Sequence, residues 1–428
     1  MPMTRAERIA ALVEEVLGTS LPVGLRTWDG SHAGPADGPQ VVLRSRRALR
    51  WLLYSPGELG LARAYVSGDL DVEGDLTEGF RTVWALTRSG SLGTSRLGPA
   101  QLAKAAGLAL RLGAVGTPPT PPAEEARLSG VLHSLRRDSS AISHHYDLSN
   151  AFYQLLLDES MAYSSGYWTS ADWSSGEPGG TLEQAQWDKL DMICRKLALR
   201  PGMRLLDVGC GWGSLLIHAA KHHGVHAVGV TLSAEQLEHV RGRVEANDLG
   251  DQVEVRRQDY RALDDAPFDA IGSIEMGEHV GEDNYPTYTA TLHRMLKPGG
   301  RLVLQQMSRG ANAPGGGAFI ERYIAPDMTM RPIGRTLGHL EGAGFEVRDV
   351  HAMREHYVPT VRAWLDTLER RWDDAVALIG ETGARVWRLY LVGGALAFEE
   401  NRMGVDQIMA VRPDSAGRSE LPPTRDWP

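Results

Sequence analysis

The sequence predicts an α/β fold in which a Rossmann-like domain is preceded by a small α+β domain. From residue 202 onwards, short runs of apolar β-forming residues alternate with helical patterns, which is typical of a buried parallel sheet. A glycine-rich loop follows the first of these runs, and a proline-rich stretch separates them from the first part of the chain. The expected strands are MRLLDVG, VHAVGVTL, VEVRRQDY, FDAIGSI and RLVLQQM.

The proline-rich stretch TPPTPPA marks a domain boundary, because clustered prolines favour an extended backbone and block helix formation. We therefore expect an amino-terminal domain at residues 1–116, a linker at 117–126 and a second domain at 127–428. Within the first domain, the spacing of apolar residues predicts amphipathic helices at 5–17 and 99–115.

The composition restricts the partners and the compartment of the protein. The 428 residues carry a formal net charge of −9, whereas a nucleic-acid partner would require a basic surface. The two cysteines, Cys194 and Cys210, lie in an expected helix and in the glycine loop, so we expect no disulfide and a reducing cytoplasm. No window approaches about 18 uninterrupted apolar residues, so we expect no membrane-spanning helix. The spacing of histidine, cysteine and aspartate indicates no metal site.

The glycine-rich loop is the strongest indication of a ligand site. Its sequence DVGCGWG begins at Asp207 and contains Gly209, Gly211 and Gly213, which allow the backbone to turn sharply and approach a ligand closely. A glycine triplet alone is also compatible with a purely structural turn between strand and helix. No lysine or arginine directly follows the loop to bind a phosphate, which favours the sulfonium cofactor S-adenosylmethionine (SAM) over a nucleotide.

The ends of the next two expected strands support this site. Thr231, Leu232 and Gln236 follow the second strand, and Asp259 and Tyr260 follow the third. The carboxyl ends of parallel strands meet at one edge of the sheet, where ligands bind in open α/β folds. We expect Tyr260 to stack on the adenine and Asp259 to accept a hydrogen bond from its amino group.

Four ordered motifs within residues 130–411 resemble the cyclopropane-fatty-acid synthase family. They are HYDLSNAFYQLLLDESMAYSSGYW from residue 145, LLDVGCGWGSLLIHAA from 205, VGVTLSAEQ from 228 and EMGEHVG from 275. The resemblance implies a class I SAM-dependent methyltransferase domain, after an amino-terminal domain that we expect to contact lipid or to form a dimer. It also implies which residues line the cofactor site beside the glycine loop: Tyr163, Ser164, Thr231, Leu232, Gln236, Asp259 and Tyr260. We expect Tyr146 to help close this pocket.

The resemblance further implies that the methyl acceptor is a cis double bond in a phospholipid acyl chain. An alkene is a poor nucleophile and takes a methyl group from a sulfonium only when the two are aligned and shielded from water. The transfer leaves a carbocation on the acyl chain. Aromatic faces and carboxylates stabilise such a charge, and a positioned base then removes a proton.

In the family, a bound bicarbonate is that base. The resemblance places its ligands at Ser165, Glu278, Gln305, Met307 and Tyr357. Ser165 and Gln305 replace the family's cysteine and histidine, and the second change matters because an amide cannot carry a proton. These two replacements weaken the expected anion site.

Glu275 is a further departure, because the family has glycine three residues before the position of Glu278. We hypothesise that Glu275 or Glu278 supplies the base directly, with bicarbonate as the remaining possibility. The alternative is that Glu275 only binds the ribose or amino acid end of the cofactor, or ends its strand in solvent.

Two more segments, starting at Gln305 and Trp387, resemble an actinobacterial branch that makes the methylene precursor of 10-methylstearate (tuberculostearate) with a separate reductase. This predicts methyl transfer to a phospholipid-bound oleoyl chain and a 10-methylene-stearoyl product. A cyclopropane synthase and a catalytically inactive lipid-binding relative are the alternatives. We expect a homodimer in the cytoplasm, bound peripherally to the phospholipid surface at the inner face of the plasma membrane.

Overall fold

The computed structural model describes residues 2–88, 99–126, 130–134, 137–138, 141, 149–169, 179–310, 316–425 and 427. Contacts between Cα atoms divide the chain into two compact units. The amino-terminal unit comprises Met1–Glu125 with Gly317–Phe319 and Gly380–Leu396, and the carboxyl-terminal unit comprises Ala126–Gly316, Ile320–Ile379 and Ala397–Pro428.

The amino-terminal unit is an α+β structure with a four-stranded sheet in the order β2-β1-β3-β4. β1 and β3 are parallel and the other pairs are antiparallel. The predicted first helix is present with a complete capping box between Thr4 and Glu7, and the second begins as predicted at Pro99. The elements are α1 (Arg5–Leu17), β1 (Gly24–Arg26), β2 (His32–Ala33), β3 (Gln40–Leu43), α2 (Arg47–Tyr54), α3 (Glu58–Val66), β4 (Leu70–Glu73), α4 (Leu76–Arg88) and α5 (Pro99–Arg111).

The amino-terminal unit also contains a segment from late in the chain, which the sequence did not indicate. Gly380 interrupts α14 (Trp372–Glu399) with φ 74° and ψ 162°, and Gly380–Leu396 then joins this unit. Arg385 stacks over the ring of Tyr65 at 4.2 Å and donates hydrogen bonds to the carbonyls of Tyr65 and Leu70. The expected division into 1–116 and 127–428 therefore assigns Arg385 to the second domain, whereas this buried cation belongs to the amino-terminal unit.

The expected linker at 117–126 is described throughout and contains neither helix nor strand. Its last part is packed, because Glu125 is buried and accepts two hydrogen bonds from Arg63, at 2.5 and 2.8 Å. A bidentate arginine–carboxylate pair of this kind is geometrically specific. Glu125 thus belongs to the amino-terminal unit.

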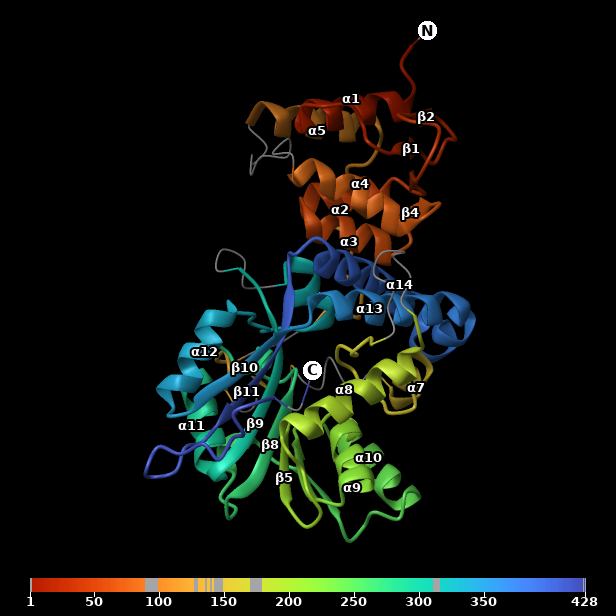
Figure 1. Cartoon of the computed structure of the whole chain (residues 1–428). Coiled ribbons are helices and arrows are strands. Elements are labelled where there is room, and N and C mark those ends of the chain that lie inside the picture. The colour runs from red at the N-terminus through yellow and green to blue at the C-terminus, as the bar shows by residue number, and fades with distance from the viewer. Residues whose placement is uncertain are drawn as a thin grey trace. The chain divides into compact units, whose positions relative to one another are not determined.

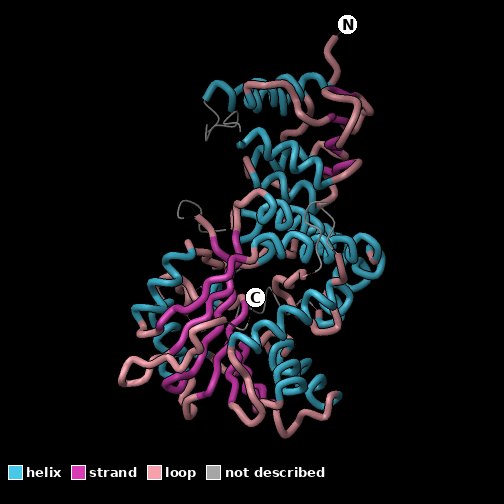
Figure 2. Tube along the Cα trace, in the orientation of Figure 1, coloured by secondary structure: helices cyan, strands magenta, loops and turns pink. Residues whose placement is uncertain are grey.

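The strands of the carboxyl-terminal unit lie side by side in one sheet (Figure 2). This sheet has seven strands in the order β10-β11-β9-β8-β5-β6-β7. The five predicted strands are β5 to β9, and they are parallel. The expectation of a parallel sheet is incomplete, because β11 inserts antiparallel between β9 and β10. The strands are β5 (Arg204–Val208), β6 (His226–Thr231), β7 (Val253–Arg257), β8 (Phe268–Ile274), β9 (Leu296–Ser308), β10 (Glu346–Ala352) and β11 (Gly404–Val411).

Helices cover both faces of this sheet, with α9 and α10 on one side and α11 and α12 on the other (Figure 1). Neighbouring residues of one strand serve different cores: Val303 packs with the first pair of helices, whereas Leu302 and Leu304 pack with the second. This makes the fold a Rossmann-like α/β sandwich. The remaining elements are α7 (Asn150–Leu156), α8 (Leu182–Lys196), α9 (Ser214–His223), α10 (Ala234–Ala246), η1 (Tyr260–Ala262), η2 (Gly277–His279), α11 (Tyr285–Met295), η3 (Ile320–Ile324), α12 (Ile333–Gly342) and α13 (Arg354–Arg370).

None of the helices in the described part of the chain is both long and apolar enough to cross a membrane.

Candidate active site

The glycine loop turns the chain from β5 into α9 at the edge of the sheet and lines a pocket. Gly209, Gly211 and Gly213 have φ values of 80°, 52° and 81°, in the left-handed region that favours glycine. A Cβ atom on Gly209 would lie 2.6 Å from the side chain of Met276. At Gly211 it would meet nothing within 4 Å among the described residues, so the backbone there borders open pocket space.

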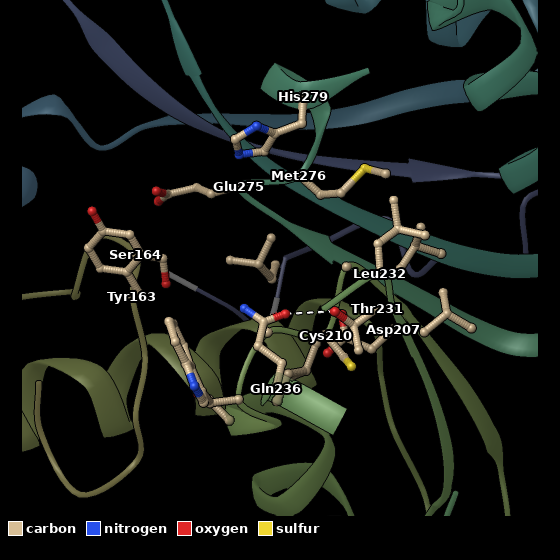
Figure 3. A pocket seen from close by; sticks show the side chains of 18 of the residues that line it. Tyr163, Ser164, Asp207, Cys210, Thr231, Leu232, Gln236, Glu275, Met276 and His279 are labelled. Carbon is tan, nitrogen blue, oxygen red and sulfur yellow. Dashed lines mark hydrogen bonds between the residues drawn. The ribbon is translucent and has the colours of Figure 1, made fainter. Parts of the chain in front are cut away.

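The end of β6 forms the next wall of the pocket. Thr231 Oγ1 donates a hydrogen bond to Gln236 Oε1 at 2.6 Å, and it accepts one from the amide of Ser233 (Figure 3). Ser233 in turn caps α10 through the Gln236 amide. These bonds fix the Gln236 side chain beside Leu232, and all of Thr231, Leu232 and Gln236 line the pocket.

Asp259 and Tyr260 also line the pocket, after β7, but their side chains already have partners. Arg261 donates to both carboxylate oxygens of Asp259, each at 2.8 Å, and bonds Asp138 as well. The Tyr260 ring contacts the ring of Tyr288 edge-on at 5.3 Å. The stacking and hydrogen bond expected for an adenine at this place stay predictions.

Tyr163 and Ser164 face the pocket from the segment after α7, opposite the strand ends. Tyr163 belongs to an aromatic cluster, with ring centroids 5.6 Å from Tyr153, 5.3 Å from Trp364 and 6.4 Å from Trp212. Such faces favour a nearby cation. Tyr146 lies outside the described residues.

Lys189 is a pocket residue that the sequence reasoning missed. It lies on α8, is 1% exposed, and donates a hydrogen bond to Ser164 Oγ at 2.8 Å. Burial lowers its pKa to about 8, although Glu275, Asp158 and Asp207 act against this shift. The available signal was a lysine in the buried stripe of a helix, four residues from both Ala185 and Ile193.

Asp207 is the penultimate residue of β5, just before the glycine loop turns, and is buried. Burial raises its pKa to about 7, against the attraction of Lys189. Among the described residues, Asp207 Oδ1 has no hydrogen-bond partner. A buried carboxylate oxygen without a donor is costly, so this atom is suited to a polar or cationic ligand in the pocket.

Glu275 is the centre of a second cluster at the end of β8, where several expected anion ligands meet. Its Oε1 accepts hydrogen bonds from the Ser165 amide at 3.0 Å and from Gln305 Nε2 at 2.9 Å. Its Oε2 accepts one from Tyr357 Oη at 2.5 Å. Three of the positions expected to bind bicarbonate thus bind the carboxylate of Glu275 instead.

The backbone of Glu275 has φ 53°, in a region that is strained for any residue with a side chain. Such strain costs about 1–3 kcal/mol and is concentrated at functional sites. Burial raises the pKa of Glu275, and its three hydrogen bonds and Lys189 oppose that shift. The carboxylate lines the pocket, so it does not end the strand in solvent.

Further hydrogen bonds hold the residues that contact Glu275. Gln407 Nε2 donates to Gln305 Oε1 at 3.0 Å, which directs the amide nitrogen of Gln305 toward Glu275. The Ser165 hydroxyl donates to the Gly166 carbonyl, so Ser165 contributes to the cluster through its backbone amide. Gln407 gave no signal in the sequence, because β11 was not expected beside β9.

Glu278 lies apart from this cluster and does not line the pocket. Its Oε1 accepts a hydrogen bond from the Met307 amide at 2.5 Å, and the side chain is 1% exposed. Burial, together with the charge of Glu275, raises its pKa to about 8. The expected bicarbonate ligands are therefore split: Met307 binds Glu278, while Ser165, Gln305 and Tyr357 bind Glu275.

The residues of the pocket fit SAM. Its lining combines aromatic rings and carboxylates with an open backbone at Gly211. Among the described lining residues, the cations Lys189 and Arg261 are already bonded, to Ser164 and Asp259 respectively. A sulfonium group suits such a site, whereas a phosphate would require basic groups.

Comparison with known proteins shows which proteins this chain resembles. The family model for mycolic acid cyclopropane synthetase matches residues 133–408. Probable fatty acid methyltransferase Rv3720 of Mycobacterium tuberculosis is 39% identical, over 95% of this chain and 94% of the relative. Tuberculostearic acid methyltransferase UfaA1 of the same species is 31% identical, over 94% of this chain and 91% of the relative. The crystal structure of mycolic acid cyclopropane synthase CmaA1 complexed with SAH and CTAB superposes with a TM-score of 0.58 at 30% identity, over 64% of this chain and 97% of that chain.

The fold, the pocket and these relatives define a class I SAM-dependent methyltransferase, with SAM as the methyl donor. The chain belongs to the mycolic acid cyclopropane synthetase family, whose members modify lipids.

Proposed function

We propose that this enzyme transfers the methyl group of SAM to the cis double bond of a phospholipid-bound oleoyl chain and releases a 10-methylene-stearoyl product. The observation that carries the proposal is the Glu275 carboxylate, which receives three hydrogen bonds from Ser165, Gln305 and Tyr357. A carboxylate fixed in this way is a built-in base beside the methyl donor. UfaA1, by name a tuberculostearic acid methyltransferase, supports the substrate class.

The methyl donor supplies an electrophilic methyl group, and the alkene uses its π electrons to form the new bond. The chain's part is to hold the two in line and to exclude water. Tyr163, which packs against Trp364, presents an aromatic face to the pocket, and Glu275 presents a negative charge to it. Both features stabilise positive charge.

Glu275 then takes the proton. When a hydride first shifts to the neighbouring carbon, loss of a proton from the new methyl group leaves an exocyclic methylene. When the proton leaves without that shift, the same electrons close a cyclopropane. Burial raises the pKa of Glu275, which strengthens it as a base. No external bicarbonate is required for either outcome.

Cyclopropane formation is the second candidate, because the matching family model is that of a cyclopropane synthetase. The two products differ only in the step between methyl transfer and proton loss. The carbon skeleton of the product therefore decides between them.

The proposed substrate places the enzyme at a membrane surface, which it reaches from the aqueous side. A methylene product also implies a separate reductase if the final lipid is the saturated 10-methyl branch.

The test is to express the full chain in a bacterial host fed oleate and to analyse the phospholipid acyl chains by mass spectrometry after derivatisation. We expect a product one methylene unit heavier than oleate with an exocyclic double bond at carbon 10. A ring would replace the proposed product by the second candidate. If the acyl chains gain no mass although the expressed protein binds SAM, methyl transfer to this acceptor is contradicted.

A further inference from the structure

A second cluster of reactive side chains lies between α8 and α9, outside the machinery described above. Cys194 on α8 and His218 and His223 on α9 converge there, and one ligand atom from each lies within 4.8 Å of the others. Cys194 is fully buried and His218 is 6% exposed, while His223 is partly exposed. The sequence spacing concealed this group, because its members come from two helices that pack together.

Two atoms in this cluster lack the partners that buried polar atoms normally have. Within the described part of the protein, neither His218 Nε2 nor His223 Nε2 has a hydrogen-bond partner. Most buried polar side-chain atoms are satisfied, and an unsatisfied one costs about 1–3 kcal/mol.

Asp191 adds a carboxylate at the open side of the cluster. Its Oδ1 lies 3.5 Å from His223 Nε2, and Asp191 is one helical turn before Cys194 on α8. A tetrahedral Zn²⁺ ion with sulfur at about 2.3 Å and nitrogen at about 2.0 Å places its ligand atoms roughly 3.5 Å apart. The observed separations of the three ligand atoms, at most 4.8 Å, exceed that geometry by up to about 1.3 Å.

We propose that Cys194, His218 and His223 bind a Zn²⁺-class metal ion, with Asp191 as the fourth ligand. A thiolate, two imidazoles and a carboxylate suit zinc better than calcium or magnesium, which prefer all-oxygen sites. The Cys194 thiol loses its proton to solvent when the metal–sulfur bond forms. Four protein ligands leave no open coordination position, so the ion has a structural role.

The ion would join two helices that support the cofactor pocket. α8 carries Lys189, and α9 begins directly after Gly213 of the glycine loop. The metal would therefore stabilise the folded state by cross-linking α8 to α9, independently of which lipid is methylated.

The test titrates chelator-treated full-length protein, under reducing conditions, with Co²⁺ as the spectroscopic probe and with Zn²⁺ as its competitor. We expect one equivalent of Co²⁺ with the visible bands of a tetrahedral site and a thiolate charge-transfer band. Zn²⁺ should displace it and raise the melting temperature. Cys194→Ser should remove the charge-transfer band, and His223→Ala should weaken binding about tenfold or more.

His223→Ala is the second variant because this side chain is only partly buried, so we expect the variant to fold. Retained SAM binding would show that it does. His226→Ala is the matched control: this histidine at the start of β6 is exposed and lies outside the cluster, so the variant should bind Co²⁺ like the wild type. The proposal is overturned if the wild type binds no Co²⁺ tightly, or if Cys194→Ser and His223→Ala bind it like the wild type.

Discussion

The two halves of the active site are built in different ways. The donor half consists of consecutive residues at strand ends, and the backbone of the glycine loop forms its central wall. The acceptor half consists of one carboxylate, Glu275, with donors from three other places in the chain, Ser165, Gln305 and Tyr357. Local backbone geometry thus determines cofactor binding, whereas tertiary structure determines the fate of the cation.

Glu275→Gln should separate the two halves most sharply. The amide retains the size of the side chain but cannot accept the proton, so turnover should fall about 100- to 10,000-fold. SAM affinity should stay close to that of the wild type, because the glycine loop is untouched. Product formation and calorimetric SAM binding measure the two effects, and a parallel loss of both would show that the halves are not separable.

Gly209→Ala should damage the donor half. The new Cβ would lie 2.6 Å from Met276, at a φ of 80°. The strain of about 1–3 kcal/mol predicts SAM binding weaker by roughly 5- to 100-fold. Gly242→Ala on α10 is the control, because no described atom lies within 4 Å of its Cβ position, and it should stabilise the helix slightly.

Lys189→Met should affect both halves, because Lys189 lowers the pKa of both Asp207 and Glu275. Without this cation both pKa values rise, so Glu275 stays protonated to higher pH. The acidic limb of the pH–rate profile should move to higher pH, and the rate at a given pH on that limb should fall about tenfold. Lys221→Met, at an exposed site on α9, should leave the profile unchanged.

Glu278→Gln should have the smallest effect, on the pH dependence of stability. Glu278 has a folded pKa of about 8 against an ordinary value of 4.5. Between these pH values the folded state holds a proton that the unfolded chain has lost. This contribution to stability is therefore complete below the lower value and is lost as pH rises toward 8. The variant should remove up to about 1.4 kcal/mol per pH unit from the slope of the unfolding free energy against pH. Denaturant unfolding at several pH values measures it, and an unchanged slope would refute the buried, protonated state.

The described residues that the sequence predicted for the donor half line one pocket, Gly213 excepted, because strand, loop and helix lie in consecutive residues with strong local preferences. The sequence named Glu275 and, as bicarbonate ligands, Ser165, Gln305 and Tyr357, but not that these three bind the Glu275 carboxylate. The Gln407–Gln305–Glu275 chain depends on the antiparallel strand β11, and Lys189 reaches the pocket only through the packing of α8. Asp259 was assigned to a ligand, yet it is bonded to Arg261. Such side-chain pairings are set by tertiary structure and leave no local pattern.

The most direct test compares the wild type with Glu275→Gly in buffers depleted of bicarbonate and supplemented with it. Glycine suits the backbone φ of 53° and leaves Ser165, Gln305 and Tyr357 facing the space of the lost carboxylate. We predict that the wild type is indifferent to bicarbonate, whereas the variant is inactive without it and regains turnover when it is added. A wild type that requires bicarbonate, or a variant fully active without it, would contradict Glu275 as the base.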